Sequence, residues 1–197
     1  MKSRTATVER NSSETRIRVT LNLDGAGESR ISTGVPFVDH MLTLFSRHGF
    51  FDLDIQAEGD LEVDCHHLLE DLGLVMGEAL TRALGDKAGI RRYGQMLLPM
   101  DETLVLIALD LSGRPGLYYQ VTPPSPTVGG FDARLMHEFF QALCVKGGIN
   151  LHIRQIESAE THHLFEAVFK GLAKALSAAV TVDPRVNGVL STKGRFD

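Results

Sequence analysis

The stretch HHLLED (66–71) recurs as HHLFEA (162–167), so the chain carries a histidine pair followed by a glutamate twice. In each copy the first histidine and the glutamate are four residues apart, which places both side chains on one face of an α-helix. These pairs are His66 with Glu70 and His162 with Glu166. Each pair can offer one nitrogen and one oxygen to the same cation.

The second histidine of each copy, His67 or His163, is rotated by about 100° from the first, because a helix has roughly 3.6 residues per turn. It cannot easily complete the shell of the cation that its neighbour binds. The two motifs therefore predict two metal ions. A single motif of this kind is more often a solvated helix start, but its duplication favours a metal site.

The sequence around both copies predicts the same order of elements, from period-two alternation for strands and 3.6-residue periodicity for helices. The predicted strands cover 16–23, 30–35, 51–59, 104–113, 116–121 and 149–155, and the predicted helices cover 37–49, 66–84, 134–148 and 162–180. The matched positions His66 and His162 are 96 residues apart, and Leu53 and Leu151, like His40 and Glu138, are 98 apart. Such near-constant offsets indicate an internal duplication.

We expect an α/β fold of the α+β type with two similar halves, residues 1–90 and 91–197. Each half should be a small sheet covered on one face by two helices. With 197 residues and 43% hydrophobic content, the chain is long enough for both halves to share a core. The halves should therefore form one compact functional domain.

The composition narrows the choice of partners and location. A formal net charge of −5 argues against nucleic acid or an anionic membrane as the main partner. No apolar run approaches the roughly 20 residues that span a bilayer, and the start MKSRTATVERNSSE lacks the apolar stretch of a signal peptide, so we expect a cytoplasmic protein. Cys65 and Cys144 have no CxxC spacing and are expected to be packing thiols.

Each metal needs further ligands beyond one histidine and one glutamate. If the halves face each other, each ion can take the adjacent histidine from the other helix. His40 and Glu138 stand at matched places on the remaining helices, and His137 is an alternative to Glu138. Imidazole and carboxylate ligands without thiolate suit Mn, Fe, Co, Ni or Zn. The sequence does not choose among these metals.

The remaining polar residues suggest an anion site. The candidates that could bind a phosphate are Arg92, Arg114, Lys170, Ser191, Thr192 and Lys193. Each could also be an ordinary surface residue. His48 is a candidate substrate contact, whereas His152 is expected to be structural. The segment STKG (191–194) is not a P-loop and DGAGESR (24–30) lacks the third glycine of a dinucleotide fingerprint, so nucleotide cofactors are unsupported.

Taken together, several segments resemble the imidazoleglycerol-phosphate dehydratase family, over nearly the whole chain from about Glu9 to Gly194. They are TGVPFVDHMLTLFSRHG (33–49), DCHHLLEDLG (64–73), PMDETLV (99–105), LDLSGRPG (109–116), LHIRQ (151–155), HHLFEAVFKGLAKAL (162–176) and STKG (191–194). The resemblance implies two similar α/β halves, a homo-oligomer of 24 subunits, and active sites between subunits that each hold two Mn²⁺ ions.

The family pattern also implies a ligand set for each metal. One set is His40, His67, His162 and Glu166, and the other is His66, Glu70 and His163 with Glu138. The family often has histidine where this chain has Glu138, and here the nearest histidine, His137, is one position earlier. The choice between Glu138 and His137 stays open at this point.

The implied reaction is the dehydration of D-erythro-imidazoleglycerol phosphate to imidazole acetol phosphate in histidine biosynthesis, by a lyase that needs no redox cofactor. The resemblance implies a metal-stabilised imidazolate and a diazafulvene-type intermediate. It assigns acid/base catalysis to Glu14, which would reach the substrate from a neighbouring subunit. The basic and hydroxyl residues named above would hold the substrate phosphate.

Two alternatives use the same ligand types. One is a metal-dependent hydrolase that activates water against a phosphorylated substrate. The other is a structural module in which the His/Glu clusters only join helices or subunits. The physiological metal, the symmetry of the assembly and any inhibition by pathway products are not determined by the sequence.

Overall fold

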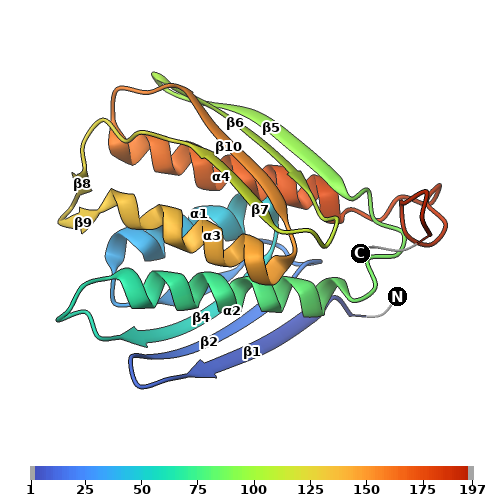
Figure 1. Ribbon diagram of the computed structural model, residues 1–197, viewed down its shortest axis with the longest axis horizontal. Coiled ribbons are helices and arrows are strands. Elements are labelled where there is room, and N and C mark those ends of the chain that lie inside the picture. Colours follow the sequence, from blue (N-terminus) through green and yellow to red (C-terminus); the bar gives the residue numbers. More distant parts are fainter. Residues whose placement is uncertain (1–2, 195–197) are drawn as a thin grey trace.

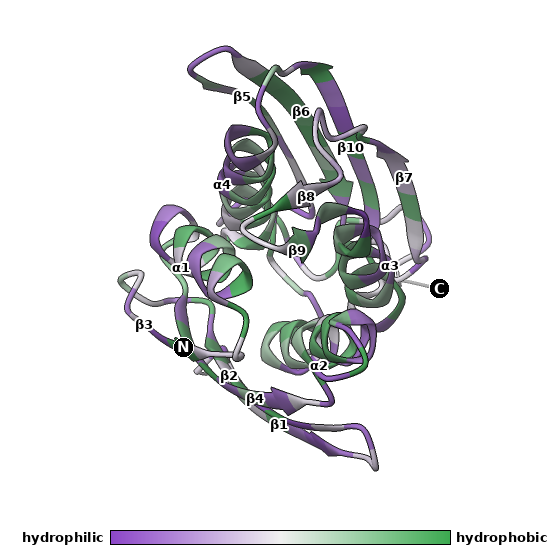
Figure 2. Ribbon diagram, turned by 90° about the vertical axis from the view of Figure 1, so that its left-hand side faces the viewer, coloured by the Kyte–Doolittle hydropathy of each residue, from purple (hydrophilic) through white to green (hydrophobic). Residues whose placement is uncertain are grey.

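The computed structural model describes residues 3–194 and places four helices between two outer β-sheets (Figures 1 and 2). The first sheet has the order β1-β2-β4-β3 and the second has the order β5-β6-β10-β7. In each sheet the first three strands pair antiparallel and the last pairs parallel to its neighbour. This shared topology confirms the predicted fold class and agrees with a duplicated half-fold. The division at residue 90 stays a prediction.

The elements follow each other in the same order in both halves. The first half contains β1 (Thr5–Asn11), β2 (Thr15–Asn22), β3 (Ser29–Ser32), α1 (Pro36–Gly49), β4 (Asp52–Gly59) and α2 (His66–Leu84). The second contains β5 (Tyr93–Met100), β6 (Thr103–Asp110), β7 (Gly116–Gln120), the short hairpin β8 (Thr127–Val128) and β9 (Phe131–Asp132), the 3₁₀ turn η1 (Ala133–Leu135), α3 (Met136–Gly147), β10 (Asn150–Glu157) and α4 (Thr161–Val180). No helix within residues 3–194 is long and apolar enough to cross a membrane.

The first strand of each half, β1 or β5, was absent from the sequence prediction. β1 buries only Val8 among its seven residues, and β5 buries only Gly94 and Leu98. Both are edge strands, so their sequences do not show the clear alternation of the central strands β2 and β6. Pro99 is tolerated in β5 because one side of an edge strand has no neighbouring strand, so not every backbone N–H is needed for pairing.

The close approach of β5 and α4 depends on Gly94. A Cβ atom at this position would overlap the Ala175 backbone carbonyl of α4. Backbone atoms cannot move aside as a flexible side chain can. The contact therefore fixes the distance between the second sheet and the helix that carries the second histidine motif.

Gly94→Ala is expected to destabilise the protein by about 1–3 kcal/mol or more, because overpacking forces backbone shifts. The measurement is unfolding by denaturant, with Gln95→Ala as the control on the same strand. Gln95 is exposed, so its substitution should change stability by less than about 0.5 kcal/mol. Equal stability of the two variants would contradict the proposed packing.

The outward faces of the two sheets differ, although their topology is the same. On β2 the outward residues include Arg16 and Arg18, whereas the corresponding positions on β6 are Leu104 and Leu106. Leu104 and Leu106 are half-buried, and Leu97 of β5, which pairs with Leu106, is 53% exposed. At these positions of β5 and β6 the outer face of the second sheet is thus apolar where that of the first is charged, although His152 and Arg154 of β10 are exposed on the same face.

Candidate metal centre and phosphate pocket

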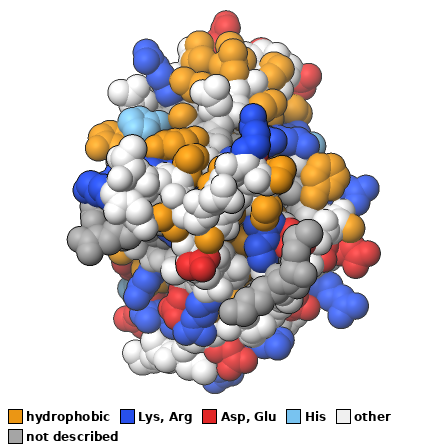
Figure 3. Space-filling model, turned by 90° about the vertical axis from the view of Figure 1, so that its right-hand side faces the viewer, with side chains coloured by type: hydrophobic (Ala, Val, Ile, Leu, Met, Phe, Trp, Pro, Cys, Tyr) orange, Lys and Arg blue, Asp and Glu red, His pale blue; other side chains and the backbone are white. Residues whose placement is uncertain are grey.

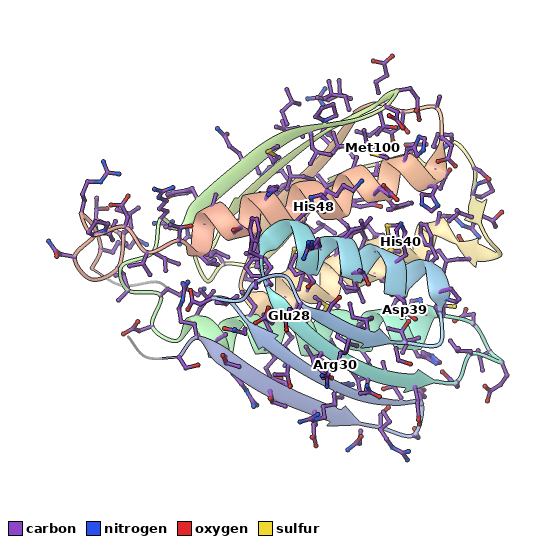
Figure 4. The ribbon with its side chains drawn as sticks, turned by 180° about the vertical axis from the view of Figure 1, so that it is seen from behind. Glu28, Arg30, Asp39, His40, His48 and Met100 are labelled. Atoms are coloured by element: carbon purple, nitrogen blue, oxygen red, sulfur yellow. The ribbon has the colours of Figure 1, made fainter. Side chains whose placement is uncertain are left out.

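The structure brings three of the predicted metal ligands together between α1 and α4. The Glu166 Oε1 atom lies 2.8 Å from His40 Nε2 and 3.2 Å from His162 Nε2. His40 points from α1 toward α4 (Figure 4), and His162 and Glu166 are one helical turn apart on α4. One donor atom from each residue lies within 4.8 Å of the others. The geometry and the imidazole and carboxylate donors fit a divalent transition metal.

Glu166 is charged although only 9% of its surface is exposed. Burial alone would raise its pKa, but hydrogen bonds and charge from Lys170, with His40 and His162, outweigh it and hold the pKa at about 2. Lys170 Nζ donates to Glu166 Oε2 at 2.6 Å and also contacts Met100 Sδ at 3.4 Å. Lys170, predicted as a phosphate ligand, therefore lies in this cluster.

The first histidine motif forms a looser pair at the start of α2. His66 Nε2 lies 3.9 Å from Glu70 Oε2, and both side chains are about half exposed. His66 and Glu70 occupy the places on α2 that His162 and Glu166 occupy on α4. They give a second nitrogen and oxygen on one helix face, as the spacing predicts.

The second histidine of each motif is held by a carboxylate through its Nδ1 atom. His67 Nδ1 lies 3.0 Å from Asp60 Oδ2, and His163 Nδ1 lies 3.0 Å from Glu102 Oε2. These hydrogen bonds are the main reason why the pKa of each histidine is raised. Glu14 lies farther away, with its Oε1 4.0 Å from His67 Nε2. An imidazole held at Nδ1 keeps Nε2 for a metal.

The crossed ligand sets are not assembled within one chain. Across residues 3–194, no hydrogen bond or ion pair joins His67 to the cluster of His40, His162 and Glu166, and none joins His163 to His66 or Glu70. The assignment of His67 and His163 to these metals therefore stays a prediction.

The two candidates for the remaining ligand lie side by side at the start of α3. His137 Nδ1 is 3.2 Å from Glu138 Oε1, and both side chains are exposed. The His137 ring packs edge-on against Tyr119 at 5.3 Å. Neither residue shares a hydrogen bond with the histidine motifs in the described part of the chain. The choice between them stays open.

Five of the predicted phosphate residues line one pocket at the other end of the molecule. The pocket has a volume of about 690 Å³, and its lining includes Arg92, Arg114, Ser191, Thr192 and Lys193. Arg185 also lines it, and the sequence analysis did not select this residue. Figure 3 looks at this end of the molecule and shows Lys and Arg side chains distributed over it.

Arg92 holds the C-terminal segment against the second sheet. Its Nε and Nη2 atoms donate to the two carboxylate oxygens of Asp110 at 2.6 and 2.9 Å. Its Nη1 donates to the Leu190 carbonyl at 2.7 Å. Arg92 therefore lines the pocket and also positions the segment that brings Ser191 and Lys193 there.

His48 lies on α1 and points toward α4 (Figure 4). Burial, followed by the positive charges of Lys170 and Lys174, lowers its pKa. A neutral imidazole at this place can donate or accept a hydrogen bond. Its role as a substrate contact stays a prediction.

The pocket and the histidine motifs are separated by the length of a helix. His162 lies at the start of α4, and the pocket residues follow its end at Val180 (Figure 1). With a rise of 1.5 Å per residue, these two positions are about 27 Å apart along the axis. One small substrate cannot contact both sites of the same chain.

One His/Glu cluster, an equivalent His/Glu pair and a basic pocket on a duplicated α/β fold are features that a metal-dependent enzyme would need. The family model for imidazoleglycerol-phosphate dehydratase matches residues 33–176. The chain belongs to the imidazoleglycerol-phosphate dehydratase family, whose members are hydro-lyases. This confirms the family resemblance noted in the sequence.

Individual relatives from this family align with the chain over almost its full length. The chain is 57% identical to imidazoleglycerol-phosphate dehydratase of Pelobacter propionicus over 98% of both chains. It is 53% identical to that of Geobacter metallireducens over 98% of this chain and 100% of the relative. The crystal structure of the Staphylococcus aureus enzyme aligns with a TM-score of 0.83 and 38% identity, covering 91% of this chain and 99% of that one.

Proposed function

We propose that this chain dehydrates imidazoleglycerol phosphate to imidazole acetol phosphate, a step of histidine biosynthesis in the cytoplasm. The observation that carries the proposal is the combination of a His/Glu cluster, an equivalent His/Glu pair and a basic pocket in a chain with full-length relatives of this name. The clusters suit an imidazole ring with two nitrogens. The pocket suits the phosphate at the other end of the substrate.

We propose that each active site holds two Mn²⁺ ions, which the cluster of His40, His162 and Glu166 and the pair of His66 and Glu70 support. The proposed sets are His40, His67, His162 and Glu166 for one ion, and His66, Glu70 and His163 for the other, with Glu138 as its fourth ligand and His137 as the alternative. When bound, the ions would supply Lewis acidity to the substrate ring and stabilise negative charge on it as water leaves. The route through a diazafulvene-type species stays a prediction.

We propose that each active site is formed between copies of the chain, in a homo-oligomer that the family resemblance predicts to have 24 subunits. The separation of pocket and clusters within one chain supports this proposal. So does the position of His67 and His163 outside the cluster of His40, His162 and Glu166, since His163 instead lies with Asp101 and Glu102 and His67 lies beside Asp60. The exposed apolar side chains of the second sheet, which include Tyr93, Leu97 and Tyr118, give a further surface for another copy to cover.

The chain's own residues bind and orient the substrate and move its protons. Arg114, Lys193 and the hydroxyl groups of Ser191 and Thr192 would bind the phosphate by charge-assisted hydrogen bonds. That anchor would hold the glycerol carbons next to the clusters. Glu14, whose side chain is 51% exposed, is free to approach a substrate held mainly by another copy and to accept or return a proton.

Product analysis separates this function from hydrolysis. The Mn²⁺-loaded protein is incubated with imidazoleglycerol phosphate, and imidazole acetol phosphate and inorganic phosphate are measured together. We expect the acetol phosphate to form without phosphate release. Release of inorganic phosphate would favour the metal-dependent hydrolase, and metal binding with no product would favour a structural metal module.

A further inference from the structure

The duplication places two glutamates at equivalent points of the two halves. Glu14 directly precedes β2 and Glu102 directly precedes β6, and they are 88 positions apart. Each is followed by a buried threonine, Thr15 or Thr103, that begins the strand. Each glutamate also faces the second histidine of the motif in its own half.

The two glutamates make different contacts despite this equivalence. The Glu102 carboxylate oxygens lie 3.0 and 3.3 Å from His163 Nδ1. Glu14 makes no such bond, and its nearest approach to His67 is 4.0 Å, at Nε2. In the first half, Asp60 takes the Nδ1 atom instead, with oxygens at 3.0 and 3.2 Å.

The two halves differ in the residue that follows the strand before the histidine helix, β4 in the first half and β10 in the second. Asp60 directly follows β4, and the residue that directly follows β10 is Ser158. The Ser158 hydroxyl shares a hydrogen bond with Thr103 Oγ1 at 2.9 Å and donates to the Glu160 carbonyl at 3.0 Å. A serine has no carboxylate, so Ser158 cannot hold His163 as Asp60 holds His67. Glu102 supplies that carboxylate from the hairpin turn.

We propose that Glu102 is a positioning residue that fixes the His163 ring with Nε2 available to a metal, and that Asp60 does the same for His67. A metal-binding histidine usually donates its other ring N–H to a carboxylate, which sets the tautomer and the ring orientation. Because Asp60 bonds to His67 Nδ1 in the first half, Glu14 is not needed to hold that histidine. The duplicated glutamates have thus taken different roles, one holding a ligand and the other moving a proton.

The inference rests on the proposed function for the roles of His163 and Glu14, but it is tested by metal binding without substrate. The metal-free full-length protein is titrated with Mn²⁺, and the affinity of each bound ion is measured. Glu102→Ala and Asp60→Asn should each weaken binding of one ion by about 10–100-fold, the range for residues that orient a ligand. Glu14→Ala, the matched control, should bind both ions as the wild type does.

A transplanted carboxylate gives the second test. In the Glu102→Ala background, Ser158→Asp recreates the arrangement of the first half and should restore most of the lost affinity. If Glu102→Ala does not fold, as judged by circular dichroism, Glu102→Gln keeps an acceptor oxygen and should show a smaller loss in the same direction.

Three results would overturn the proposal. They are wild-type affinity for both ions in the Glu102 variants, an equal loss in Glu14→Ala, and no binding of Mn²⁺ by the wild type. If the wild type binds two ions but forms no imidazole acetol phosphate, the proposed function fails instead. The affinities of the variants then still decide the role of Glu102.

Discussion

Replacing His162 by alanine is expected to reduce dehydration by about 10³-fold or more, since bound metal provides several kcal/mol of charge stabilisation and each 1.4 kcal/mol is a factor of ten. His162 shares Glu166 Oε1 with His40, at 3.2 and 2.8 Å. Without this imidazole, the cluster keeps one nitrogen and a carboxylate that Lys170 already neutralises. Elemental analysis should find about one ion per chain in place of two.

Arg82→Ala is the control for this experiment. Arg82 is exposed in the last turn of α2, and within residues 3–194 its one ion pair is with Glu78, four residues before it. Such a surface pair contributes little to stability. The control should keep both ions and full activity. If His162→Ala keeps two ions and wild-type turnover, the cluster between α1 and α4 is not the metal centre.

Replacing Glu14 by glutamine is expected to lower kcat by about 10²–10⁴-fold, the usual contribution of a general acid or base. The amide has nearly the same shape as the carboxylate but cannot exchange a proton at catalytic pH. Because Glu14 forms no hydrogen bond with His67, metal content and substrate KM should change little. The measurements are steady-state kinetics together with metal analysis.

Glu9→Gln is the matched control for Glu14. Glu9 is an exposed glutamate on the neighbouring strand β1, where it pairs with Arg18. It should leave kcat unchanged. Loss of metal from Glu14→Gln would mean that Glu14 is a ligand, and unchanged kcat would remove it from the reaction.

The duplication and the central elements could be predicted because their signals are local. In β2 and β6, buried apolar residues alternate with more exposed ones. In α2 and α4, the buried apolar residues form a stripe along the helix. The edge strands β1 and β5 could not be found in this way, since pairing with a neighbour determines them more than burial does. Their existence follows once one half is compared with the other.

The sequence proposed His40, His162 and Glu166 as ligands, which the structure brings together, but not the carboxylates that hold the neighbouring histidines. His40 and Glu166 were identified from spacing, whereas Asp60 and Glu102 were not, because an isolated carboxylate in a turn has no distinctive pattern. The 96- and 98-residue offsets found in the sequence do not lead from Glu14 to Glu102, because the equivalent strands β2 and β6 are only 88 residues apart. Lys170 was grouped with the phosphate residues because it is basic, but its partner is Glu166, which lies one helical turn away.

The basic pocket and the histidine motifs of one chain are too far apart to act on the same substrate molecule. Residues 185–193, which line much of the pocket, follow the end of α4, while the histidine motifs lie at the starts of α2 and α4. Figure 1 shows the segment after α4 at the opposite end of this helix from its start. Under the proposed function, a substrate anchored in the pocket of one copy presents its ring to the clusters of another. Assembly and catalysis then depend on each other.

Mixing two inactive variants tests this shared site most directly. His162→Ala keeps an intact pocket, and a chain with both Arg114→Ala and Lys193→Ala keeps intact metal clusters. If each site combines one end from each of two copies, random co-assembly at equal amounts should recover about a quarter of wild-type activity. Activity no higher than the average of the two separate variants, in oligomers shown to contain both chains, would contradict a site shared between copies.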